Sequence, residues 1–372
     1  MSIKPLFWIS FLVFPVFNLA ALTGDVTDVV VVDKLNPQGP YKRIWQPHFA
    51  KWKEDHYVAA YGLELRGKYD MGDLICSITT DGGKNWSPRI TVFDHRLRNG
   101  TVQYAYANPV LFKPEGQDVI WLYCMRSPLH YRDSENSDLA AAYTADGGYS
   151  WTHVELSVGY QGNMIVVGGI TKVMRDGIPR YLLPAHRNSR RHDKTGDRRQ
   201  FLLESTSLVK WNLNNYIEVN EPIFLHEGNV SYTAGDELKM IMRTARMDSE
   251  VPLDPALAYS TVSKDGGQTW STAQAEPELP NFRAKSYFGK DSSGRHIYVY
   301  SDSFQRHALL YKTREPGGEW SEEKPFYHDN NRNSYPTLIE DSPENWLVMF
   351  DSSNDPEIRR NRIRFGRLNL SE

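Results

Sequence analysis

The sequence SITTDGGKNWS, residues Ser77–Ser87, recurs along the chain. Two further copies are YTADGGYSW at Tyr143–Trp151 and STVSKDGGQTW at Ser260–Trp270. YKTREPGGEW, at Tyr311–Trp320, is a degenerate copy, and STSLVKW, at Ser205–Trp211, is a fainter one. The pattern polar-x-x-x-Asp-Gly-Gly-x-x-Trp predicts a tight hairpin. The Asp caps backbone amides, the glycines take positive φ, and the Trp opens the next strand with a large apolar face.

The tryptophans that close these blocks are regularly spaced. Successive intervals are 65, 60, 59 and 50 residues for Trp86, Trp151, Trp211, Trp270 and Trp320. Between the blocks lie β-branched and aromatic runs separated by Gly, Pro, Asn and Asp, such as HYVAAYGLEL and HIYVYSDS. Units of about 55–60 residues with four strands each, repeated about six times, predict an all-β fold, a six-bladed β-propeller.

The repeats extend over nearly all of the 372 residues, which favours one propeller domain over residues 25–372. The early run VTDVVVVDKL has no local partner and is expected to close the ring with C-terminal strands. A net charge of −3 provides no global basic field for nucleic acid or an anionic membrane. The 10 Trp and 21 Tyr suit both a β-rich fold and a sugar-binding surface. The sequence predicts no oligomeric state.

The N-terminus has the features of a secretory signal peptide. Lys4 precedes an apolar run from Pro5 to about Leu22, which ends near the small residues Ala20 and Ala21. We expect residues 1–21 to be removed and the protein to be secreted or periplasmic, with no membrane association afterwards. The alternative is an uncleaved anchor, because the run is near the lower length limit for a membrane span.

Two sequence features leave alternatives open. Cys76 and Cys124 are compatible with a disulfide in an oxidising compartment and equally with two buried thiols. The arginine-rich segment at 186–199 is either a solvated loop or a basic rim that attracts an acidic glycan. No Cys or His spacing forms a zinc site, and the sequence predicts no metal and no cofactor.

The Asp-Gly-Gly-x-x-Trp blocks resemble the Asp-box repeats of the sialidase superfamily. In that family the boxes mark the fold and lie on the rim away from the active centre. The resemblance therefore implies structural roles for Asp81, Asp146 and Asp265. Sialidases hold the substrate carboxylate with three arginines, and they use a Tyr–Glu pair as nucleophile and an Asp as acid/base.

Several segments resemble the strands that carry those groups. EGNVSYTAGDELKMIMR has the family's spacing between Glu227, the base, and Arg243, the second arginine. SDSFQRHALLYKT resembles the third-arginine strand, with Arg306. NRNSYPTLIED resembles the nucleophile strand, with Tyr335. In RGKYDMGDLI, Asp70 takes the acid/base position.

Other positions are implied less directly. Asp73 competes with Asp70 for the acid/base role. ANPVLF, with Asn108, and YLLPAHRN, with His186, resemble inner strands of the second and third blades, which adds both residues to the expected substrate-binding set. His48, which follows Trp45-Gln-Pro, belongs to the same set.

The resemblance is broken at the first arginine. The family has Arg-Ile-Pro, whereas this chain has YKRIWQPH and places Trp45 at the arginine position. Arg43 lies two residues earlier, on the same face of the strand. Pro336 also stands where sialidases carry a small polar residue. A weakened clamp implies acidic glycans in general rather than sialic acid alone.

Each residue also has a purely structural interpretation. Arg243 or Arg306 alone could form an ion pair at a blade edge, Tyr335 could be a core residue, and Glu227 could be an exposed loop acid. A propeller, however, gathers the inner strands of all blades around one axis. Four matches in the expected order therefore favour a shared pocket.

Three functions are compatible with these residues. The first is a sialidase-like exo-glycosidase that hydrolyses a terminal acidic sugar through a tyrosyl-enzyme intermediate. The second is a propeller lyase acting on uronic acids, with Tyr335, His48, His130 or His186 as base and Arg243 or Arg306 as neutraliser. The third is a glycan-binding propeller without catalytic activity, which needs no contact between Tyr335 and Glu227. The first is the prediction that we follow, and an acidic oligo- or polysaccharide is the expected partner.

Overall fold

The computed structural model describes residues 24–132, 134–160, 162–187, 199–246, 253–329, 331–353, 355 and 360–371. The expected signal peptide and most of the arginine-rich segment lie outside the described residues. Within those ranges, no helix has the length and apolarity to span a bilayer.

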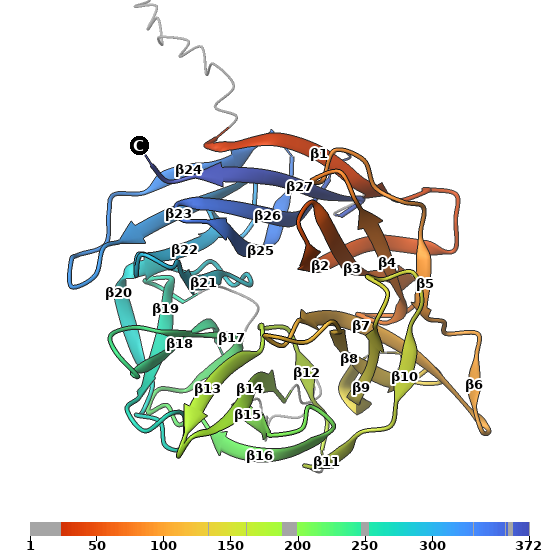
Figure 1. Ribbon diagram of the computed structural model, residues 1–372, viewed down its shortest axis with the longest axis horizontal. Coiled ribbons are helices and arrows are strands. Elements are labelled where there is room, and N and C mark those ends of the chain that lie inside the picture. The colour runs from red at the N-terminus through yellow and green to blue at the C-terminus, as the bar shows by residue number, and fades with distance from the viewer. Residues whose placement is uncertain are drawn as a thin grey trace, which may run out of the picture.

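The strands form six antiparallel blades arranged in a ring, as the spacing of the repeats predicted (Figure 1). Blade 1 contains β2 (Tyr41–Lys53), β3 (His56–Leu65), β4 (Gly72–Thr79) and β5 (Ile90–Phe93). Blade 2 contains β7 (Val102–Phe112), β8 (Ile120–Pro128), β9 (Asp138–Thr144) and β10 (Thr152–Val154), with the two-residue β6 (Arg98–Asn99) on β7 and the 3-10 turn η1 (Ser134–Asn136) before β9. One bridge, Gly72 to Tyr106, joins these two blades into a single sheet.

The remaining blades follow the same order, with the first strand innermost. Blade 3 contains β12 (Ile165–Val166), β13 (Thr171–Arg175), β14 (Ile178–His186), β15 (Gln200–Ser205) and β16 (Lys210–Tyr216), and β11 (Ser157–Gly159) runs parallel to β16. Blade 4 contains β17 (Ile223–Tyr232), β18 (Leu238–Arg246), β19 (Leu257–Ser263) and β20 (Gln274–Pro280). Blade 5 contains β21 (Tyr287–Lys290), β22 (His296–Ser301), β23 (Ala308–Arg314) and β24 (Lys324–His328).

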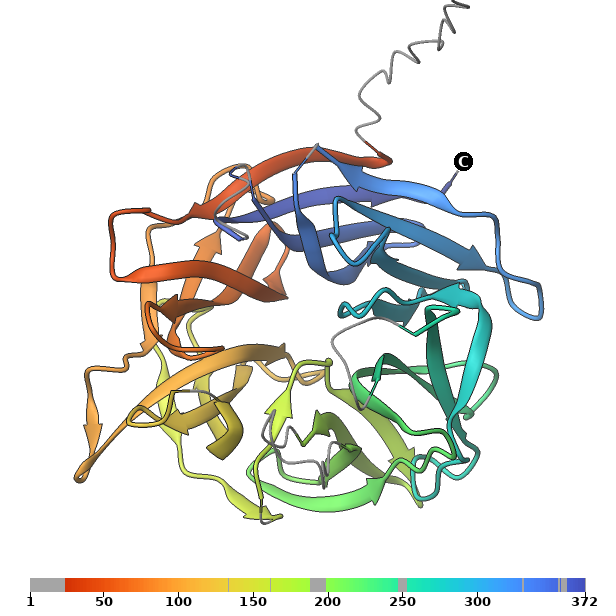
Figure 2. The same ribbon diagram turned by 180° about the vertical axis from the view of Figure 1, so that it is seen from behind.

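The last blade closes the ring with strands from both ends of the chain. It contains β25 (Asn333–Ser342), β26 (Asn345–Ser352), β27 (Arg362–Asn369) and, on its outer edge, β1 (Val26–Lys34). β1 pairs antiparallel with β27, from Val26 opposite Leu368 to Lys34 opposite Arg362. The red first strand and the blue last strand lie side by side in both views (Figure 1 and Figure 2). The expectation that VTDVVVVDKL closes the ring is therefore confirmed.

The Asp boxes form the turn between the third and fourth strands of their blades. In the first box, Asp81 Oδ1 accepts the Thr79 hydroxyl at 2.8 Å and the Asn85 amide at 3.0 Å. The Gly83 amide donates to Thr79 Oγ1 at 3.0 Å, and Trp86 Nε1 donates to the Gly83 carbonyl at 3.1 Å. Gly83 has φ 93, and a Cβ there would lie 2.2 Å from a ring carbon of Phe365, so both backbone angle and space require glycine.

The weaker copies keep part of this turn. In STSLVKW, Leu208 takes the left-handed position with φ 65, its amide donates to Ser205 Oγ at 2.8 Å, and Trp211 Nε1 donates to its carbonyl at 3.2 Å. In the degenerate block Gly317 has φ 73, but the buried Nε1 of Trp320 has no acceptor in the described part of the chain. The turn therefore tolerates loss of the Asp or of the tryptophan bond.

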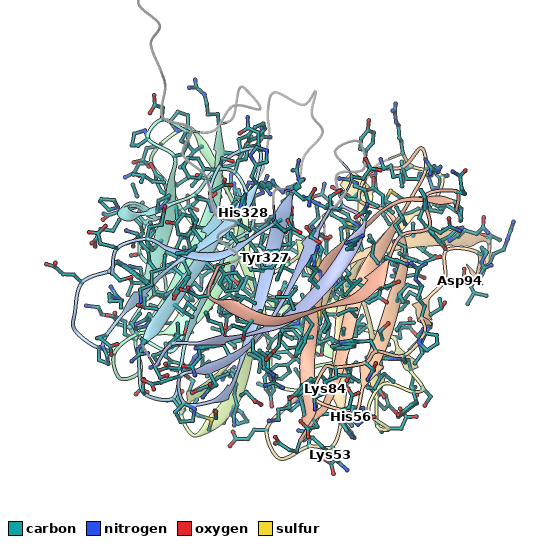
Figure 3. All side chains as sticks on the ribbon, turned by 90° about the horizontal axis from the view of Figure 1, so that it is seen from above. Lys53, His56, Lys84, Asp94, Tyr327 and His328 are labelled. Carbon is teal, nitrogen blue, oxygen red and sulfur yellow. The ribbon has the colours of Figure 1, made fainter. Side chains whose placement is uncertain are left out.

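The boxes lie on the face opposite the start of the inner strands. The Gly82 amide donates to the carbonyl of Asp55, in the turn that ends β2. Figure 3 places Lys84 of the first box beside Lys53 and His56 at the same face of the ring. Residues in the first half of an inner strand, where the site residues were predicted, thus lie away from the boxes.

Cys76 and Cys124 are free and buried in one apolar cluster of blades 1 and 2. Burial raises the pKa of both thiols. Of the two alternatives left open by the sequence, the structure has the pair of buried thiols.

We expect Asp146→Ala to lower the free energy of unfolding by about 1 kcal/mol at pH 7. Asp146 accepts the Ser150 amide at 3.0 Å and the Ser150 hydroxyl at 2.6 Å, and it is exposed, so solvent screens part of the effect. Burial alone would raise its pKa, but the bonds from Ser150 and Thr144 lower it to about 2. A carboxyl with a lowered pKa stabilises the fold above its unfolded value of about 3.9, and that stabilisation is lost as pH falls towards about 2.

Urea unfolding at several pH values measures this difference. The control is Asp118→Ala, an exposed aspartate outside the boxes. If the two variants have equal stability at pH 7, the box carboxylate does not contribute as described.

Candidate active site

The inner strands of blades 1, 2, 4 and 6 share one irregularity, a β-bulge. The pairing register shifts in β2 between Trp45 and His48, in β7 between Ala107 and Val110, in β17 between His226 and Asn229, and in β25 between Ser334 and Thr337. The first unpaired residue of each bulge has a positive φ: Gln46 (50°), Asn108 (58°), Glu227 (54°) and Tyr335 (56°). A bulge redirects a side chain, here on the strands that face the middle of the ring (Figure 1).

The residue after each bulged position explains why the strand tolerates the irregularity. Pro47, Pro109 and Pro336 follow three of the bulged residues, and Gly228 follows Glu227. Proline has no amide to pair, so it loses nothing where the ladder is interrupted. Pro336, which departs from the sialidase pattern, therefore belongs to a feature that this chain repeats in blades 1, 2 and 6.

In blade 3 the glycine pair Gly168–Gly169 lies between β12 and β13. A Cβ on Gly168 would lie 1.9 Å from the carbonyl oxygen of Gly228. Glycine is therefore needed where blades 3 and 4 approach each other beside Glu227. Positive φ also occurs at Asp70 (53°) and Arg306 (64°), so the predicted acid and one predicted arginine have the same strained backbone.

Tyr335 and Glu227 meet in the middle of the ring. The Tyr335 hydroxyl donates to Glu227 Oε1 at 3.3 Å, and both residues are buried. Arg243 Nη1 donates to the other oxygen, Glu227 Oε2, at 2.8 Å. Burial alone would raise the pKa of Glu227, but Arg243, His186 and Arg306 lower it below its usual value. Glu227 is thus an ionised carboxylate directed at a phenol.

Arg306 lies over the Tyr335 ring, with its guanidinium carbon 5.6 Å from the ring centroid. Its Nη2 donates to the carbonyl of Arg283 at 2.8 Å, whereas Nε and Nη1 are buried without an acceptor among the described residues. Burial and neighbouring guanidinium groups lower its pKa to about 9, which leaves it charged at neutral pH. Two donors of a buried cation thus remain available to a ligand.

Asp70 lies at the edge of this group. Its side chain is 41 % exposed, and Arg43 Nη2 lies 3.6 Å from Oδ1. Although part of the side-chain surface is exposed, the surrounding protein partly desolvates the carboxyl and raises its pKa against the lowering effect of Arg43, and the charges of Glu64 and Glu227 raise it further. A carboxyl that holds its proton to higher pH is suited to a general acid.

Asp73, by contrast, is buried in a structural network. Its carboxylate accepts the Tyr41 hydroxyl and, at 2.7 Å, the amide of His95. Asp73, Asp94 and His95 have ligand atoms within 4.8 Å of one another, the spacing of a metal site. However, His95 Nδ1 already lies 2.6 Å from Asp73 Oδ1, and Asp94 forms an ion pair with Arg96. These side chains therefore already have protein partners.

The structure places Arg43 with the acid rather than with the two arginines. Its guanidinium pairs with the buried Glu64 and lies 4.9 Å from the Trp45 ring centroid. Trp45 is buried and packs edge to face on Tyr335 with 6.4 Å between centroids. The first arginine position is thus filled by an indole, and Arg43 lies beyond it.

Asn108 and His186 both lie near the centre. Asn108 is buried on its bulge, and its Oδ1 has no donor among the described residues. His186 is buried, and its ring lies 5.3 Å from that of His226. Its charged form lowers the pKa of Glu227, which places it within electrostatic reach of the base.

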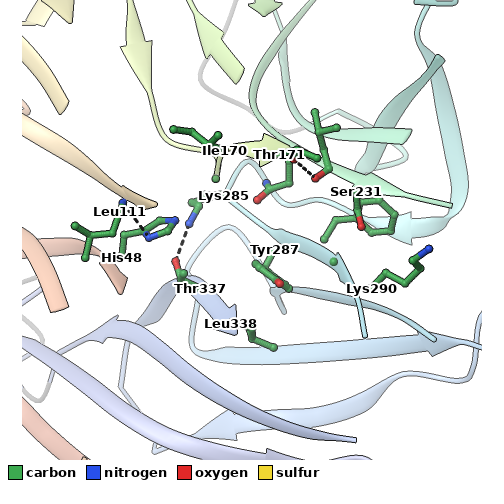
Figure 4. Close-up of a pocket in the computed structure, with 15 residues that line it drawn as sticks. His48, Leu111, Ile170, Thr171, Ser231, Lys285, Tyr287, Lys290, Thr337 and Leu338 are labelled. Carbon is green, nitrogen blue, oxygen red and sulfur yellow. Dashed lines mark hydrogen bonds between the residues drawn. The ribbon is translucent and has the colours of Figure 1, made fainter. Parts of the chain in front are cut away.

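His48 has a different location from the one expected. It lines a cavity of about 250 Å³ beyond the bulges, towards the box face, and its Nδ1 accepts the amide of Leu111 at 3.2 Å. Figure 4 shows the ring beside Lys285, whose ammonium points to Thr337. Burial and the charge of Lys285 lower the pKa of His48 to about 3. His48 is therefore a neutral wall residue, and the structure does not bring it to Tyr335.

His130, the other distant histidine considered as a lyase base, is exposed after β8 and packs on Tyr131 with centroids 4.1 Å apart. Neither His48 nor His130 is among the residues that contact Tyr335 in the described part of the chain.

The sequence analysis missed Arg360 and Lys285. Arg360 follows β26, is 4 % exposed, and lies 4.5 Å from the centroid of Tyr335 and 5.3 Å from that of Trp45. Lys285 is buried and donates to the Pro336 carbonyl and to Thr337 Oγ1, both at 3.1 Å, which supports the Tyr335 bulge. Burial lowers its pKa to about 8. Lys285 is a charged residue just before the apolar strand β21, and this position was the available sequence signal for it.

Comparison with known proteins fits this architecture. Residues 70–344 match the BNR repeat-like domain family. The chain belongs to that family. No curated protein matches the chain.

The solved structures that resemble the chain share its fold at low identity. A Dyadobacter fermentans DSM 18053 protein of unknown function has a TM-score of 0.69 and 15% identity, over 93% of this chain and 99% of that one. The NanB sialidase of Streptococcus pneumoniae has a TM-score of 0.68 and 10% sequence identity, over 92% of this chain and 70% of the NanB chain. The α-L-arabinofuranosidase Arb93A of Fusarium graminearum has a TM-score of 0.65 and 11% sequence identity, over 94% of this chain and 99% of the Arb93A chain. The chain therefore has the sialidase-type propeller fold, which is also the fold of an arabinofuranosidase.

Proposed function

We propose that this BNR-repeat propeller is an exo-glycosidase that removes a terminal acidic sugar from a glycan with retention of configuration. The observation that carries the proposal is the contact between Tyr335 and Glu227 at 3.3 Å, with Arg243 on the second carboxylate oxygen. A binding protein without catalysis has no need of this contact. The secretion expected from the N-terminus suits an enzyme that meets extracellular glycans.

The first half-reaction follows from the positions of the side chains. The Tyr335 oxygen attacks the anomeric carbon and gives its proton to Glu227, while Asp70 gives its proton to the departing glycosidic oxygen. The carbon–oxygen bond to the leaving group breaks as the bond to Tyr335 forms. A phenol suits a sugar whose anomeric carbon is next to a carboxylate, because a carboxylate nucleophile would be repelled there.

The second half-reaction reverses the proton transfers. Asp70, now ionised, takes a proton from water, and the resulting hydroxide oxygen attacks the anomeric carbon. The bond to Tyr335 breaks, and Glu227 returns the proton to the phenolic oxygen. Two inversions at one carbon leave the sugar with its original configuration.

The guanidinium groups support an acidic substrate. Arg306 presents two buried donors without an acceptor in the described residues, and charge-assisted bonds to a carboxylate would satisfy them. The arabinofuranosidase neighbour acts on a sugar without a carboxylate, so the fold alone does not select the substrate.

A panel of aryl glycosides of N-acetylneuraminic acid, glucuronic acid and arabinofuranose tests the proposal. We expect release from an acidic sugar, no release from arabinofuranoside, and a first-formed product of unchanged anomeric configuration by NMR. A 4-linked uronic-acid polysaccharide is incubated in parallel and its ultraviolet absorbance is recorded, because β-elimination removes the proton at C5, expels the sugar linked at O4 and leaves a conjugated unsaturated sugar. Appearance of that product would establish the lyase alternative, and preference for arabinofuranoside would refute the acidic substrate.

A further inference from the structure

Three guanidinium groups surround the phenol of Tyr335. Arg243 bonds its partner Glu227, Arg306 lies 5.6 Å from the ring centroid, and Arg360 lies 4.5 Å from it. Arg306 and Arg360 are 6 % and 4 % exposed. The charge of Arg360 lowers the pKa of Arg306 and that of Asp70, so Arg360 lies within reach of both the clamp side and the acid side of the site.

The cations outnumber their carboxylate partners. Arg243 pairs with Glu227 at 2.8 Å, and Arg360 Nε lies 3.7 Å from Asp351 Oδ1. Arg306 has no carboxylate within ion-pair distance in the ranges that the structure describes, only the carbonyl of Arg283. Buried charge without a counter-charge is costly, so the group is suited to receive one anion.

The unused donors show where that anion would bind. Nε of Arg360 and Nε and Nη1 of Arg306 are buried, and no acceptor bonds them within the described segments. Asp351 accepts the Gln46 amide at 3.0 Å and the Ser334 hydroxyl at 2.6 Å, so each of its oxygens already accepts one hydrogen bond, and Arg360 Nε lies beyond hydrogen-bond distance of it. A planar carboxylate matches the fork of a guanidinium group.

Arg360 is held in this position by the neighbouring blade. Its carbonyl accepts the amide of Ile44 at 3.1 Å, next to Trp45 on β2. The indole of Trp45 has Arg43 at 4.9 Å and Arg360 at 5.3 Å from its ring centroid. Arg43 is engaged by Glu64, whereas Arg360 also contacts the ring of the nucleophile.

We propose that Arg360 is the specificity-determining residue that completes the carboxylate clamp with Arg243 and Arg306. The clamp thus takes its third cation from the connection between β26 and β27, in place of the arginine that β2 lacks at Trp45. The inference rests on the proposed function, because it assigns the carboxylate of the same sugar to these groups. The ligand class is a monosaccharide acid, which should bind more tightly than its methyl ester.

Binding of free sugars to the full chain tests this assignment without turnover. Isothermal titration calorimetry compares N-acetylneuraminic acid and glucuronic acid with their methyl esters, which lack the charge. The variants are Arg360→Met, which keeps an apolar chain over Trp45, and Arg360→Lys, which keeps charge without the fork. The matched control is Arg364→Met, because Arg364 also lies over a tyrosine, Tyr327 at 5.5 Å, but pairs with Asp329 at 2.8 Å.

We expect the native chain to prefer one acid to its ester and Arg360→Met to weaken binding of that acid roughly 10- to 100-fold. The ester should bind both proteins alike, Arg360→Lys should be intermediate, and Arg364→Met should match the native chain. Equal binding of the acid by Arg360→Met and native protein would overturn the proposal. Equal losses for acid and ester would also overturn it, since they would indicate a packing role.

The two proposals fail differently. A native chain that binds the acid through Arg360 but hydrolyses no glycoside refutes the proposed function and leaves the clamp. A native chain that hydrolyses acidic glycosides while Arg360→Met binds them unchanged refutes the clamp alone. A native chain that binds neither acid better than its ester refutes the clamp as well.

Discussion

Tyr335→Phe is expected to lower kcat on an acidic glycoside by at least about 10³-fold while the substrate still binds. The substitution removes the oxygen that attacks the anomeric carbon and leaves the ring, which packs on Trp45 with 6.4 Å between centroids. Arg360 keeps its aromatic partner, so the positions of the cations should not change. Because the guanidinium groups bind ground state and transition state alike, the loss falls on kcat rather than on affinity.

Tyr327→Phe is the matched control for this experiment. Tyr327 is also a buried tyrosine with an arginine over its ring and a carboxylate near its hydroxyl, here Arg364 and Asp329. Any general effect of removing such a hydroxyl should appear in both variants. Initial rates and calorimetric affinities separate the two outcomes. A Tyr335→Phe enzyme with more than a tenth of native kcat would exclude Tyr335 as the nucleophile.

The ring was predictable because its signals are local. Each box encodes its own turn in about eight residues, and the tryptophan spacing sets the length of one repeat unit, which divides the chain into about six blades without any knowledge of tertiary contacts. The closing strand was predictable for a related reason, since a run such as VTDVVVVDKL with no neighbour in sequence must pair elsewhere. The family resemblance supplied the order of the site residues.

The bulges were not predicted, although the chain carries a signal for them. Proline at positions 47, 109 and 336 interrupts strands that otherwise read as buried, and proline within a strand is confined to sheet edges and bulges. That signal would have marked Gln46, Asn108 and Tyr335 as the residues turned towards the axis. Glu227 lacks it, because glycine follows.

Arg360 could not be found in this way. It lies outside the strands that resemble the family, and its place beside Trp45 depends on how blade 6 meets blade 1. The partners of Arg43 were not predictable for a similar reason. Two residues along a strand keep the same face, but the β2 register also shifts between Tyr41 and Arg43, and the buried Glu64 pairs with that guanidinium. Tertiary pairing, rather than strand periodicity, decided both positions.

Asp70→Asn is expected to slow hydrolysis by roughly 10²- to 10⁴-fold when the leaving group is an ordinary sugar alcohol. An alkoxide is a poor leaving group, so departure depends on the proton that Asp70 supplies. An activated aryl glycoside departs without that proton, and its first half-reaction should be much less affected. An asparagine is similar in size and keeps the hydrogen-bonding acceptor towards Arg43, so the arrangement around Glu64 is preserved.

The pH profile gives a second measurement of the same role. The pKa of Asp70 is raised, so its acid form, the one needed in the first step, persists to higher pH than that of a free aspartic acid. In the native enzyme kcat/KM should therefore fall as pH rises through this pKa, and in Asp70→Asn that limb should be absent. Asp73→Asn is the informative comparison. Asp73 accepts hydrogen bonds from Tyr41 and His95 in a buried network, so this substitution should lower the stability of the fold and leave the leaving-group dependence of the rate unchanged. If Asp73→Asn rather than Asp70→Asn makes the rate depend on the leaving group, the acid has been assigned to the wrong carboxylate.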